Sequence, residues 1–588
     1  MKNKLLPYIL LVVMLLCSCG KNSDAKGSES LAVSEAQENG TESANEAVKG
    51  TESLSDIKTD TEILDGPGTD DAQNSEKQAL IHLVQTDISK GKQAGADYEG
   101  SALVDYPVFH LTEADAIKYP ELEKALNTLN KKYEDEYAKH LNASHELAEA
   151  AVADGSDMQI RFFDSLSAQI RRADSRIVSI FKNYSSYSGG VHGYYAFYGD
   201  NIDPETGNEI TLNDVVSDAD SLREMVKEKL YSNYPEVHFD NLDTALADIC
   251  STGDMAIPWT MDYSGVTLYF NPYHLASYAD GMQVITVPFN ENPDIFNRKY
   301  LEIPESFVQQ LDITIPLTLD INGDGINEAL FITEEKGDAI GDGYNVGYAE
   351  WIIYCEDKSV RIADGCYYGD FYLVYANGQY YVYVFEVSDN DYSICTVVDL
   401  NKMECRKDKN FNASLAGLDS GYEYNEDGYT STRSHFTFTD PGAVELSSRI
   451  EVLGSNGGRK VYHTGSDGWP VSDDRWFNVS SSIVLTAKQD VSCAEVDENG
   501  TEKSDALLKE GMQYVLIRTD NKSWADIQEV YSGEYSKESD SPFAYIDGPS
   551  GLKSDRPIYR IPYDDDTWPH TIYDSEENEV FDGIMYAG

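Results

Sequence analysis

The feature that most constrains this chain is a sharp change in composition near residue 98. Residues 20–97 contain no Phe, Trp or Tyr and are rich in Ser, Glu, Gly, Thr and Asn, whereas aromatic residues are frequent from Tyr98 onward. A segment with so little apolar surface does not offset the conformational entropy lost on folding. We therefore predict a disordered acidic linker over residues 20–97, a flexible stalk that precedes the folded part of the chain.

Residues 1–19 have the layout of an export signal. Met1–Lys4 is short and basic, and Leu5–Leu16 is apolar but short for a membrane-spanning helix. The run Leu16-Cys17-Ser18-Cys19-Gly20 resembles a bacterial lipobox, with an aliphatic residue three positions and a small residue one position before Cys19. This resemblance implies lipidation of Cys19 by several acyl chains, palmitate among them, and anchoring at the extracytoplasmic face of the cell membrane. An ordinary secretory signal with incidental cysteines is the alternative.

The charge of the chain restricts its partners. There are 103 acidic and 45 basic residues, which gives a formal net charge of −58. Nucleic acid is excluded as a partner because its phosphates would be repelled. Cationic proteins, basic peptides and metal ions are favoured, although an acidic surface that only keeps an exported protein soluble is an equal alternative.

Six cysteines follow the signal region, and an oxidising exterior would allow them to form disulfides. Cys395 and Cys405 flank an expected turn, and Cys355 and Cys366 are similarly close in sequence. Their spacing leaves the pairing open and does not match the paired Cys-x-x-Cys pattern of a structural zinc site.

The periodicity predicts an α+β domain first and β structure afterwards. Pro120 to about Ala151 carries leucines and tyrosines at helical spacing, which predicts a long amphipathic helix. Short strands and a second helix over about 219–231 complete the α+β region. From about residue 311 the pattern is almost entirely β, and Asn377-Gly378 between two apolar runs predicts a type I′ hairpin.

A small β-barrel is expected at the C-terminus, over residues 481–588. Leu508-Lys509-Glu510-Gly511, followed by Tyr514–Asn521 and Trp524–Ile527, resembles the cadence of bacterial SH3-like barrels. The complete fold class is thus an α+β domain, an all-β region and an SH3-like barrel behind a disordered N-terminal stalk.

Two stretches of the α+β region are distinctive. They read Tyr187-Ser188-Gly189-Gly190-Val191-His192-Gly193-Tyr194-Tyr195 and Leu268-Tyr269-Phe270-Asn271-Pro272-Tyr273-His274-Leu275-Ala276-Ser277-Tyr278-Ala279-Asp280-Gly281. Together they resemble the extracellular domain of the lysozyme-sensing anti-sigma factor RsiV, which is also the non-catalytic part of the peptidoglycan deacetylase PdaC. The resemblance covers about residues 100–295 and implies a PdaC-type subdomain over 98–200, an RsiV-type subdomain over 201–300 and a separate β-rich domain over 301–480.

The departures from that family limit what the resemblance implies. This sequence shows neither the transmembrane helix nor the sigma-binding segment of RsiV, and no two of its ten histidines have the His-x-x-x-His spacing of the PdaC catalytic domain. The resemblance therefore implies a binding module, whose partner in the family can be lysozyme, a strongly basic protein. Neither anti-sigma signalling nor deacetylation is implied.

The two motifs supply the candidate site residues. We expect binding to involve His192, Tyr194 and Tyr195, with a hydrogen-bonded structural role as the leading alternative for His192. Tight turns and the shape of the loop after a strand are the expected roles of the structural set, which is Gly189, Gly190, Gly193, Asn271, Pro272, Tyr273 and Gly281.

A candidate calcium loop spans residues 320–328. Asp320, Asn322, Asp324 and Glu328 place side-chain oxygens at positions 1, 3, 5 and 9, and Ile326 offers its backbone carbonyl. Such oxygens suit Ca²⁺, here in a bracing role. Phe331 stands where an EF-hand needs Glu, so the loop resembles those of extracellular β-rich proteins. An acidic hairpin that binds no metal is the alternative.

No catalytic signature is present: there is no Gly-x-Ser-x-Gly elbow, phosphate-binding glycine loop or zinc-protease helix. The sequence therefore predicts a binding lipoprotein that captures lysozyme or another cationic wall-active protein. A peptidoglycan- or glycan-binding scaffold of the cell envelope is the second hypothesis. A wall hydrolase with unrecognised carboxylates is the third.

Overall fold

The computed structural model divides the chain into two units, Met1–Lys77 and Gln78–Gly588. The signal segment, Cys19 and most of the expected stalk belong to the first unit and lie outside the described residues. Within the second unit the structure describes residues 78–586 apart from 96–99, 155–159, 240–241, 254–255, 337–348, 367, 388–392, 409–410, 426–427, 480, 482, 538–543, 547–550 and 565–569.

The predicted linker extends too far at its C-terminal end. Strand β1 (Leu83–Ala94) lies inside it and pairs with a strand on each side. Ile81, Leu83 and Ala94 are buried. The absence of aromatic residues was a misleading criterion here, because aliphatic residues suffice for a strand that has neighbours on both sides.

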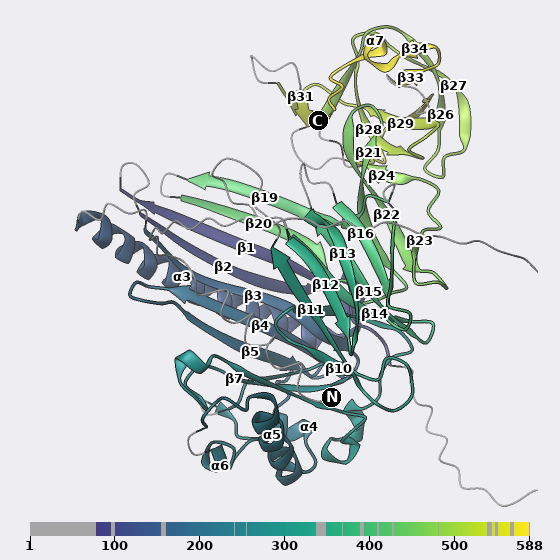
Figure 1. The fold of residues 1–588 in the computed structure, drawn as a ribbon. Coiled ribbons are helices and arrows are strands. Elements are labelled where there is room, and N and C mark those ends of the chain that lie inside the picture. The colour runs from purple at the N-terminus through teal and green to yellow at the C-terminus, as the bar shows by residue number, and fades with distance from the viewer. Residues whose placement is uncertain are drawn as a thin grey trace, which may run out of the picture. The chain divides into compact units, whose positions relative to one another are not determined.

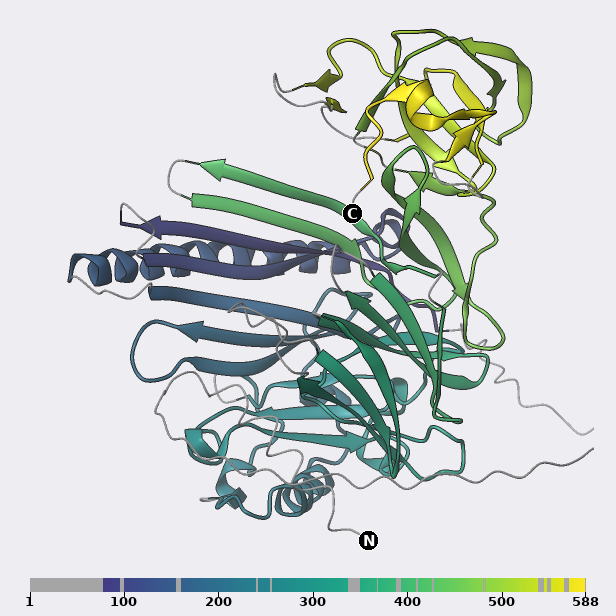
Figure 2. The same ribbon diagram turned by 45° about the horizontal axis from the view of Figure 1, so that its top comes forward.

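A seven-stranded sheet combines five strands from the first half of the chain with two from the second half (Figures 1 and 2). Every neighbouring pair is antiparallel except β2 and β3, which are parallel. The strands in spatial order are β19 (Gly417–Asn425), β20 (Gly428–Phe436), β1, β2 (Gly100–Leu111), β3 (Ile160–Asp174), β4 (Ile177–Tyr187) and β5 (Tyr194–Ile202).

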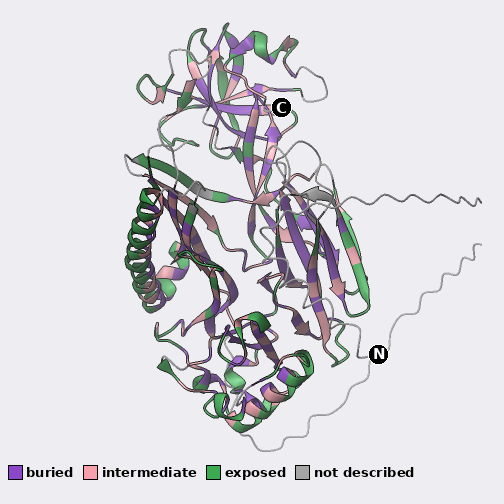
Figure 3. Ribbon diagram, turned by 60° about the vertical axis from the view of Figure 1, so that its left-hand side comes forward, coloured by how far each residue is buried: buried purple, intermediate pink, exposed green. Residues whose placement is uncertain are grey.

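The expected long helix is α3 (Pro120–Ala153), which follows the short α2 (Glu113–Lys118). A parallel pair of strands needs a crossover connection, and α3 supplies the one from β2 to β3. Both tyrosines and most of the leucines of this helix are buried against the sheet, whereas its outer side is exposed (Figure 3). Among the described residues, no helix is both long and apolar enough to span a bilayer.

The β19–β20 hairpin crosses the predicted domain division at residue 301. Strand β20 pairs with β1 from Val84↔Phe436 to Lys92↔Gly428, although these residues are far apart in sequence. The ring of Tyr429 lies across Gly91, where an added Cβ would come within 2.3 Å of it. The β-rich middle region therefore contributes two strands to the sheet of the first domain.

A smaller α/β layer packs against the part of the sheet formed by β4 and β5. Asn201 of β5 donates to the carbonyl of Trp259 at 3.0 Å, and a Cβ at Gly199 would meet that oxygen at 1.9 Å. The close approach thus needs glycine at residue 199. The layer consists of α4 (Leu212–Val215), α5 (Ala219–Asn233), α6 (Leu242–Ala245), a sheet of β6 (Trp259–Met261), β7 (Gly265–Phe270) and β8 (Gln283–Pro288), and the 3₁₀ helices η2 (Tyr278–Asp280), η3 (Pro293–Ile295) and η4 (Arg298–Tyr300).

The middle region contains two antiparallel sheets that share one apolar core, to which Ile353, Phe371 and Val382 contribute. The predicted Asn377-Gly378 hairpin is confirmed: both residues have positive φ, and β14 and β15 pair up to Ala376↔Gln379. One sheet has β10 (Leu317–Leu319), β11 (Glu328–Lys336), β12 (Ala349–Cys355) and β13 (Lys358–Cys366); the other has β17 (Glu404–Lys407), β16 (Ser393–Asp399), β15 (Gln379–Val387), β14 (Tyr368–Ala376) and β9 (Phe307–Leu311).

The C-terminal region is also β-rich, but its described strands form a branched sheet without a closed barrel, so the SH3-like barrel is not confirmed. The sheet includes β21 and β22, so it starts before the expected boundary at residue 481. Its strands are β18 (Ser414–Leu415), β21 (Val444–Glu451), β22 (Ser455–Thr464), β23 (Pro470–Val471), β24 (Phe477–Val479), β25 (Ile483–Ala487), β26 (Val491–Val496), β27 (Glu502–Leu508), β28 (Gln513–Thr519), β29 (Trp524–Glu529), β30 (Tyr535–Ser536), β31 (Ala544–Ile546), β32 (Ile558–Pro562) and β35 (Phe581–Asp582); β33 (Thr571–Ile572), β34 (Ser575–Glu576) and α7 (Glu577–Val580) lie beside it.

A buried arginine joins the large sheet to the segment that leads into the middle region. Arg172 of β3 is 0% exposed. Its Nε donates to Asp174 Oδ2 at 2.7 Å, and its terminal nitrogens donate to the backbone carbonyls of Tyr300 and Glu302, both at 2.9 Å. Every one of these acceptors would be left without its charged donor if the guanidinium were removed.

The adjacent Arg171 reaches two further elements. It donates to Asp262 Oδ2 at 3.0 Å and to the carbonyl of Gln310 in β9 at 3.2 Å. Gln309 donates to the same Asp262 oxygen at 3.1 Å. We call Arg171, Arg172, Asp174 and Asp262 the buried charge network.

Replacing Arg172 with Met is expected to lower the free energy of unfolding by about 3–5 kcal/mol, because Asp174 would remain buried without a counter-charge. Urea denaturation followed by circular dichroism measures the change. The matched control is Arg176→Met, which breaks a partly exposed ion pair with Glu302 and should cost below about 1 kcal/mol. Equal losses in the two variants would contradict a special role for the buried network.

One histidine, His82, lies between two carboxylates, and its protonation makes the stability of the fold depend on pH. His82 Nδ1 lies 2.8 Å from Asp115 Oδ2, and its Nε2 lies 3.4 Å from Asp440 Oδ2. Hydrogen bonds to Asp115 and Asp440 raise the pKa of His82 from 6.5 to about 9. Because the folded pKa exceeds the unfolded one, the stabilisation is complete below pH 6.5 and is lost as the pH rises through about 9.

Comparing the wild type with His82→Gln should therefore show a pH-dependent difference in melting temperature. The variant is expected to melt lower at pH values below the unfolded pKa of histidine, and the difference should shrink as the pH approaches the folded pKa. A difference that stays constant over this range would mean that the histidine contributes by shape and not by charge.

Candidate functional site

The two distinctive motifs meet at one end of the β4–β5 hairpin. The ring of His192, in the turn between these strands, stacks on Tyr278 of η2 with centroids 4.1 Å apart. Tyr278 donates its hydroxyl to the Gly193 carbonyl at 2.9 Å. The rings of Tyr195 and Tyr273 also contact the Tyr278 ring, with centroids 5.6 and 5.8 Å away. We call His192, Tyr195, Tyr273 and Tyr278 the aromatic cluster.

The hairpin turn depends on glycine for its shape. Gly189 and Gly190 have φ of +98° and +99°, in the region that favours glycine. A Cβ at Gly193 would come within 2.6 Å of the Ser186 carbonyl. His192 Nδ1 lies 2.8 Å from the Gly193 carbonyl, a contact in which the nitrogen must be the donor. His192 thus makes a structural hydrogen bond and still presents an exposed ring.

The second motif fixes its loop against β5. The side-chain amide of Asn271 accepts from the Phe197 N–H at 2.8 Å and donates to the Phe197 carbonyl at 3.0 Å. Pro272 is buried beside it, whereas Tyr273 has a positive φ and is 65% exposed. Gly281, also at positive φ, ends η2. The loop therefore holds Tyr273 outward on a rigid base.

Tyr194 does not belong to this cluster. Successive side chains of a strand point to opposite faces, so Tyr194 and Tyr195 of β5 diverge. Tyr194 lies 6.1 Å from Tyr184 on the other face. There Tyr184 donates to Asp164 at 2.7 Å, and burial raises the pKa of Tyr184 to about 12. The three expected binding residues thus lie on two faces, and Tyr278, which the sequence motif contains, was missed as their partner.

The aromatic cluster has the chemistry of a recognition surface. Tyrosine rings present negative faces that attract lysine and arginine, by roughly 0.5–1 kcal/mol when exposed and about 2 when desolvated. Rigid tyrosines are also enriched among the residues that dominate protein–protein binding energy. The fully exposed Val191 beside His192 adds apolar surface.

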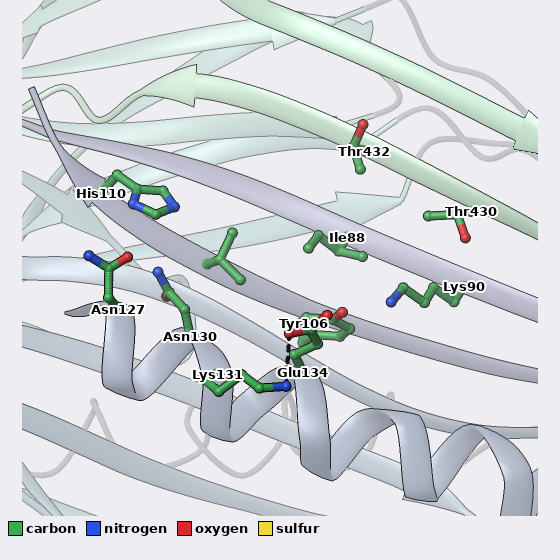
Figure 4. A pocket seen from close by; sticks show the side chains of 11 residues that line it. Ile88, Lys90, Tyr106, His110, Asn127, Asn130, Lys131, Glu134, Thr430 and Thr432 are labelled. Carbon is green, nitrogen blue, oxygen red and sulfur yellow. Dashed lines mark hydrogen bonds and ion pairs between the residues drawn. The ribbon is translucent and has the colours of Figure 1, made fainter. Parts of the chain in front are cut away.

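A groove of about 410 Å³ lies on the opposite side of α3, between the helix and strands β1, β2 and β20 (Figure 4). Its walls exist because the β19–β20 hairpin extends the sheet beyond β1. Hydroxyl, amide, imidazole and ammonium groups line it above an aliphatic and aromatic floor. The lining residues are Ile88, Lys90, Tyr106, Val108, His110, Asn127, Asn130, Lys131, Glu134, Thr430 and Thr432.

Several of these groups already have partners. Asn130 bonds to the backbone N–H and carbonyl of Phe109 at 2.9 and 2.7 Å. Lys131 pairs with Glu134 at 3.3 Å along the α3 wall of the groove (Figure 4). Lys90 lies 5.6 Å from the centre of the Tyr106 ring. The groove is therefore a polar, partly satisfied surface.

The candidate calcium loop connects two strands, β10 and β11, as its flanks predict. Asp320 accepts from the N–H groups of Gly323 at 2.7 Å and Gly325 at 2.8 Å, and Asn322 Oδ1 accepts from Asp324 at 2.8 Å. Asp324 accepts from the Ile326 N–H at 2.8 Å. Glu328 turns its carboxylate back to the N–H of Ile321 at 2.7 Å.

These bonds shape the turn without gathering the acidic side chains around one point. Within the described ranges, no group of three or more His, Cys, Asp or Glu residues is placed to hold a metal ion. The loop is ordered by its own hydrogen bonds, and calcium binding there stays a prediction.

The expected cysteine neighbours do not face each other. Cys405 pairs with Val398, and Cys395 with Phe385, so the two cysteines are out of register across β16 and β17. Cys355 pairs with Lys358 and Cys366 with Ala349, at opposite ends of their ladder. Cys250, Cys355, Cys395, Cys405 and Cys493 carry free thiols.

Residues 213–290 match the model of a family described as a protein of unknown function, DUF3298. A DUF3298 domain spans this range. It includes α5, the three-stranded sheet and η2, and hence the Tyr273 and Tyr278 half of the aromatic cluster. The other half, on the β4–β5 hairpin, precedes the domain. No curated protein matches the chain.

Two solved structures of DUF3298 family proteins are similar to part of the chain. The one from Bacteroides fragilis is 18% identical with a TM-score of 0.30, and the match covers 38% of this chain and 96% of that chain. The one from Pseudomonas aeruginosa is also 18% identical, with a TM-score of 0.24 and coverage of 40% and 98%.

Calcium is expected to raise the unfolding free energy of the wild type, by about 2.7 kcal/mol at a concentration a hundredfold above Kd. Asp324→Asn should weaken this response, because it removes a charge while keeping the oxygen that accepts from Ile326. Thermal unfolding with calcium or with a chelator measures the effect. Asp312→Asn, in another turn, is the matched control. Equal responses of the wild type and both variants would show that calcium does not bind at this loop.

Proposed function

We propose that this protein is an extracytoplasmic lipoprotein, anchored to the cell membrane through Cys19, that captures lysozyme or another cationic wall-active protein. The observation that carries the proposal is the aromatic cluster, in which two motifs shared with the RsiV and PdaC type of domain meet at an exposed surface. The DUF3298 match over one of these motifs is consistent with that resemblance.

Charge and aromatic contact have different tasks in this proposal. A net charge of −58 attracts a basic protein over long distances and speeds its encounter by about 10- to 1,000-fold. That attraction is not specific, because any cation experiences it. The ring of Tyr273 acts only at contact, where it favours a guanidinium or ammonium group placed over it.

A binding role is also the simplest use of this geometry. The cluster offers ring faces, one hydroxyl engaged with a carbonyl and one imidazole engaged with another, which together make a rigid, preorganised surface. Rigid aromatic groups lose little conformational entropy on binding. We propose binding without catalysis as the activity of this region.

The second candidate is a scaffold that binds wall glycan, and the groove beside α3 is the observation that favours it. Its volume of about 410 Å³ is within the range of small-ligand sites. Thr430, Thr432 and Asn127 offer the hydroxyl and amide groups that pair with sugar hydroxyls. Loss of binding to purified wall material in Thr430→Val, with lysozyme capture intact, would favour this candidate.

Calorimetry with lysozyme across a salt series tests the leading proposal. The wild type is expected to bind stoichiometrically at physiological ionic strength, and Tyr273→Ala should weaken binding by about tenfold or more, the effect of losing roughly 1.4 kcal/mol. Its stability should change little because the side chain is exposed. The matched control is Tyr231→Ala, whose ring is 53% exposed on α5 of the same domain.

Binding that disappears on adding salt, or that is weakened equally by both substitutions, would leave only a general attraction between acid and base. Strong binding that ignores Tyr273 would keep the capture of a cationic protein but move it to another surface.

A further inference from the structure

The two edges of the seven-stranded sheet differ. At the β5 edge, the side chain of Asn271 bonds both the N–H and the carbonyl of Phe197, at 2.8 and 3.0 Å, so the loop after β7 occupies the backbone of that strand. At the other edge, β19 pairs only with β20 in the described part of the chain (Figure 1). The side chains of residues 420–424 are all exposed. Figure 2 shows β19 as the outermost strand of this sheet. Arg459 donates to the Gly417 carbonyl at 3.3 Å, at the start of this strand. From Ser420 onward, the outer row of N–H and C=O groups in the described strand is open to pairing.

Natural sheets usually protect such an edge. They shorten the strand, place lysine or proline on it, or twist it away with a bulge. Strand β19 has nine residues and contains neither lysine nor proline. Its one irregularity lies between Gly417 and Asp419, after which the register with β20 continues to Asn425. Most of the strand is thus a regular template for another strand.

The side chains on this edge indicate which strand it would accept. Tyr422 and Tyr424 are 52% and 80% exposed, with ring centroids 4.5 Å apart. Tyr422 also stacks on Tyr429 at 5.4 Å, and Tyr429 is held over Gly91. The result is a supported row of ring faces beside an open backbone edge, a setting that favours arginine and lysine side chains.

The charge around β19 also favours a basic partner strand. Glu423 lies between the two tyrosines in the sequence and is exposed on the opposite face of β19. The sequence from residue 417 to 429 contains four acidic residues and neither lysine nor arginine. The nearby cations are Arg433, which pairs in register with Ser420 on β20, and Arg459 at Gly417, both toward the start of the strand and away from the two tyrosines. A second copy of β19 would therefore bring like charges together across the new pair, which is destabilising in a sheet. An extended basic segment would meet opposite charge instead.

We propose that β19 accepts an extended, lysine- and arginine-containing segment of a partner protein as an eighth strand. Backbone hydrogen bonds along the edge would supply affinity and the tyrosine rings with Glu423 would supply selectivity, as in other cases of strand addition. The inference rests on the proposed function for the cationic nature of the partner. It adds a docking surface at the opposite edge of the sheet from the DUF3298 domain.

A pair of peptides tests the mode of binding. One is a short peptide of alternating lysine and valine, and the other is the same peptide N-methylated at consecutive central residues, which keeps the charge but removes the strand donors on both edges. The first is expected to bind at physiological salt and to slow hydrogen exchange of β19 amides by about tenfold or more. The second should bind at least about tenfold more weakly.

A pair of charge variants tests the place of binding. Ser420→Lys with Glu423→Lys should abolish peptide protection of β19. Glu228→Lys with Ser232→Lys is the control, since it makes the same change in net charge at exposed positions of α5. Equal binding of both peptides, or equal loss in both variants, would overturn the proposal.

Two further readouts separate the possible failures. If lysozyme binds while neither peptide protects β19, the docking proposal is wrong and the proposed function still holds. If the first peptide protects β19 but lysozyme does not bind, the docking proposal holds and the proposed function is wrong. Sedimentation of both variant proteins covers self-association, because a dimer that dissociates only in the β19 variant would make a second copy the occupant and overturn the proposal.

Discussion

The buried charge network is the interaction on which the rest of this structure depends. Arg171 and Arg172 stand next to each other on β3, yet they bind groups from the β6–β7 turn, from residues 300–302 and from β9. Burying two guanidinium groups costs several kcal/mol for each ion unless every donor finds an acceptor in good geometry. Arg171 Nε is buried without a partner among the described residues, and the terminal nitrogens of both arginines find their acceptors only when the large sheet, the DUF3298 sheet and the start of the middle region are placed together. The network thus selects that arrangement, whatever its net contribution to stability.

The aromatic cluster is a consequence of this arrangement. His192 and Tyr195 come from the large sheet, and Tyr273 and Tyr278 come from the DUF3298 domain. The two halves meet because Gly199 lets β6 approach β5 and because Asn271 bonds to both backbone groups of Phe197. A shift of one residue in this register would separate His192 from Tyr278 and turn Tyr195 to the other face. The aromatic cluster therefore depends on buried polar contacts that are some distance from it.

Local patterns in the sequence predicted local structure well. The spacing of leucine and tyrosine indicated α3, and Asn377-Gly378 indicated the hairpin between β14 and β15, because each signal depends on residues close in sequence. The glycine-rich and Asn-Pro-Tyr motifs indicated a shared region without showing that Tyr278 joins them. Pairing of β1 with β20 was not predictable, because a strand pattern fixes which residues share a face but not which distant strand lies beside it. The aromatic-free composition even pointed away from β1. The split of Tyr194 from Tyr195 follows directly from strand alternation and needed only the assignment of β5 as a strand.

In the proposed role, a strongly acidic protein would face a problem of selectivity that these surfaces would help to solve. Long-range attraction raises the local concentration of every cation, and salt screens it over about 8–10 Å. Discrimination must then come from groups that act at contact. The aromatic cluster requires a cation placed over a fixed ring face, and the β19 edge requires an extended backbone in register. The two requirements are independent, and they lie at opposite edges of one sheet, so a partner that meets both would gain from their combined effective concentration. A small ion or a flexible polycation meets neither geometry and experiences only the charge.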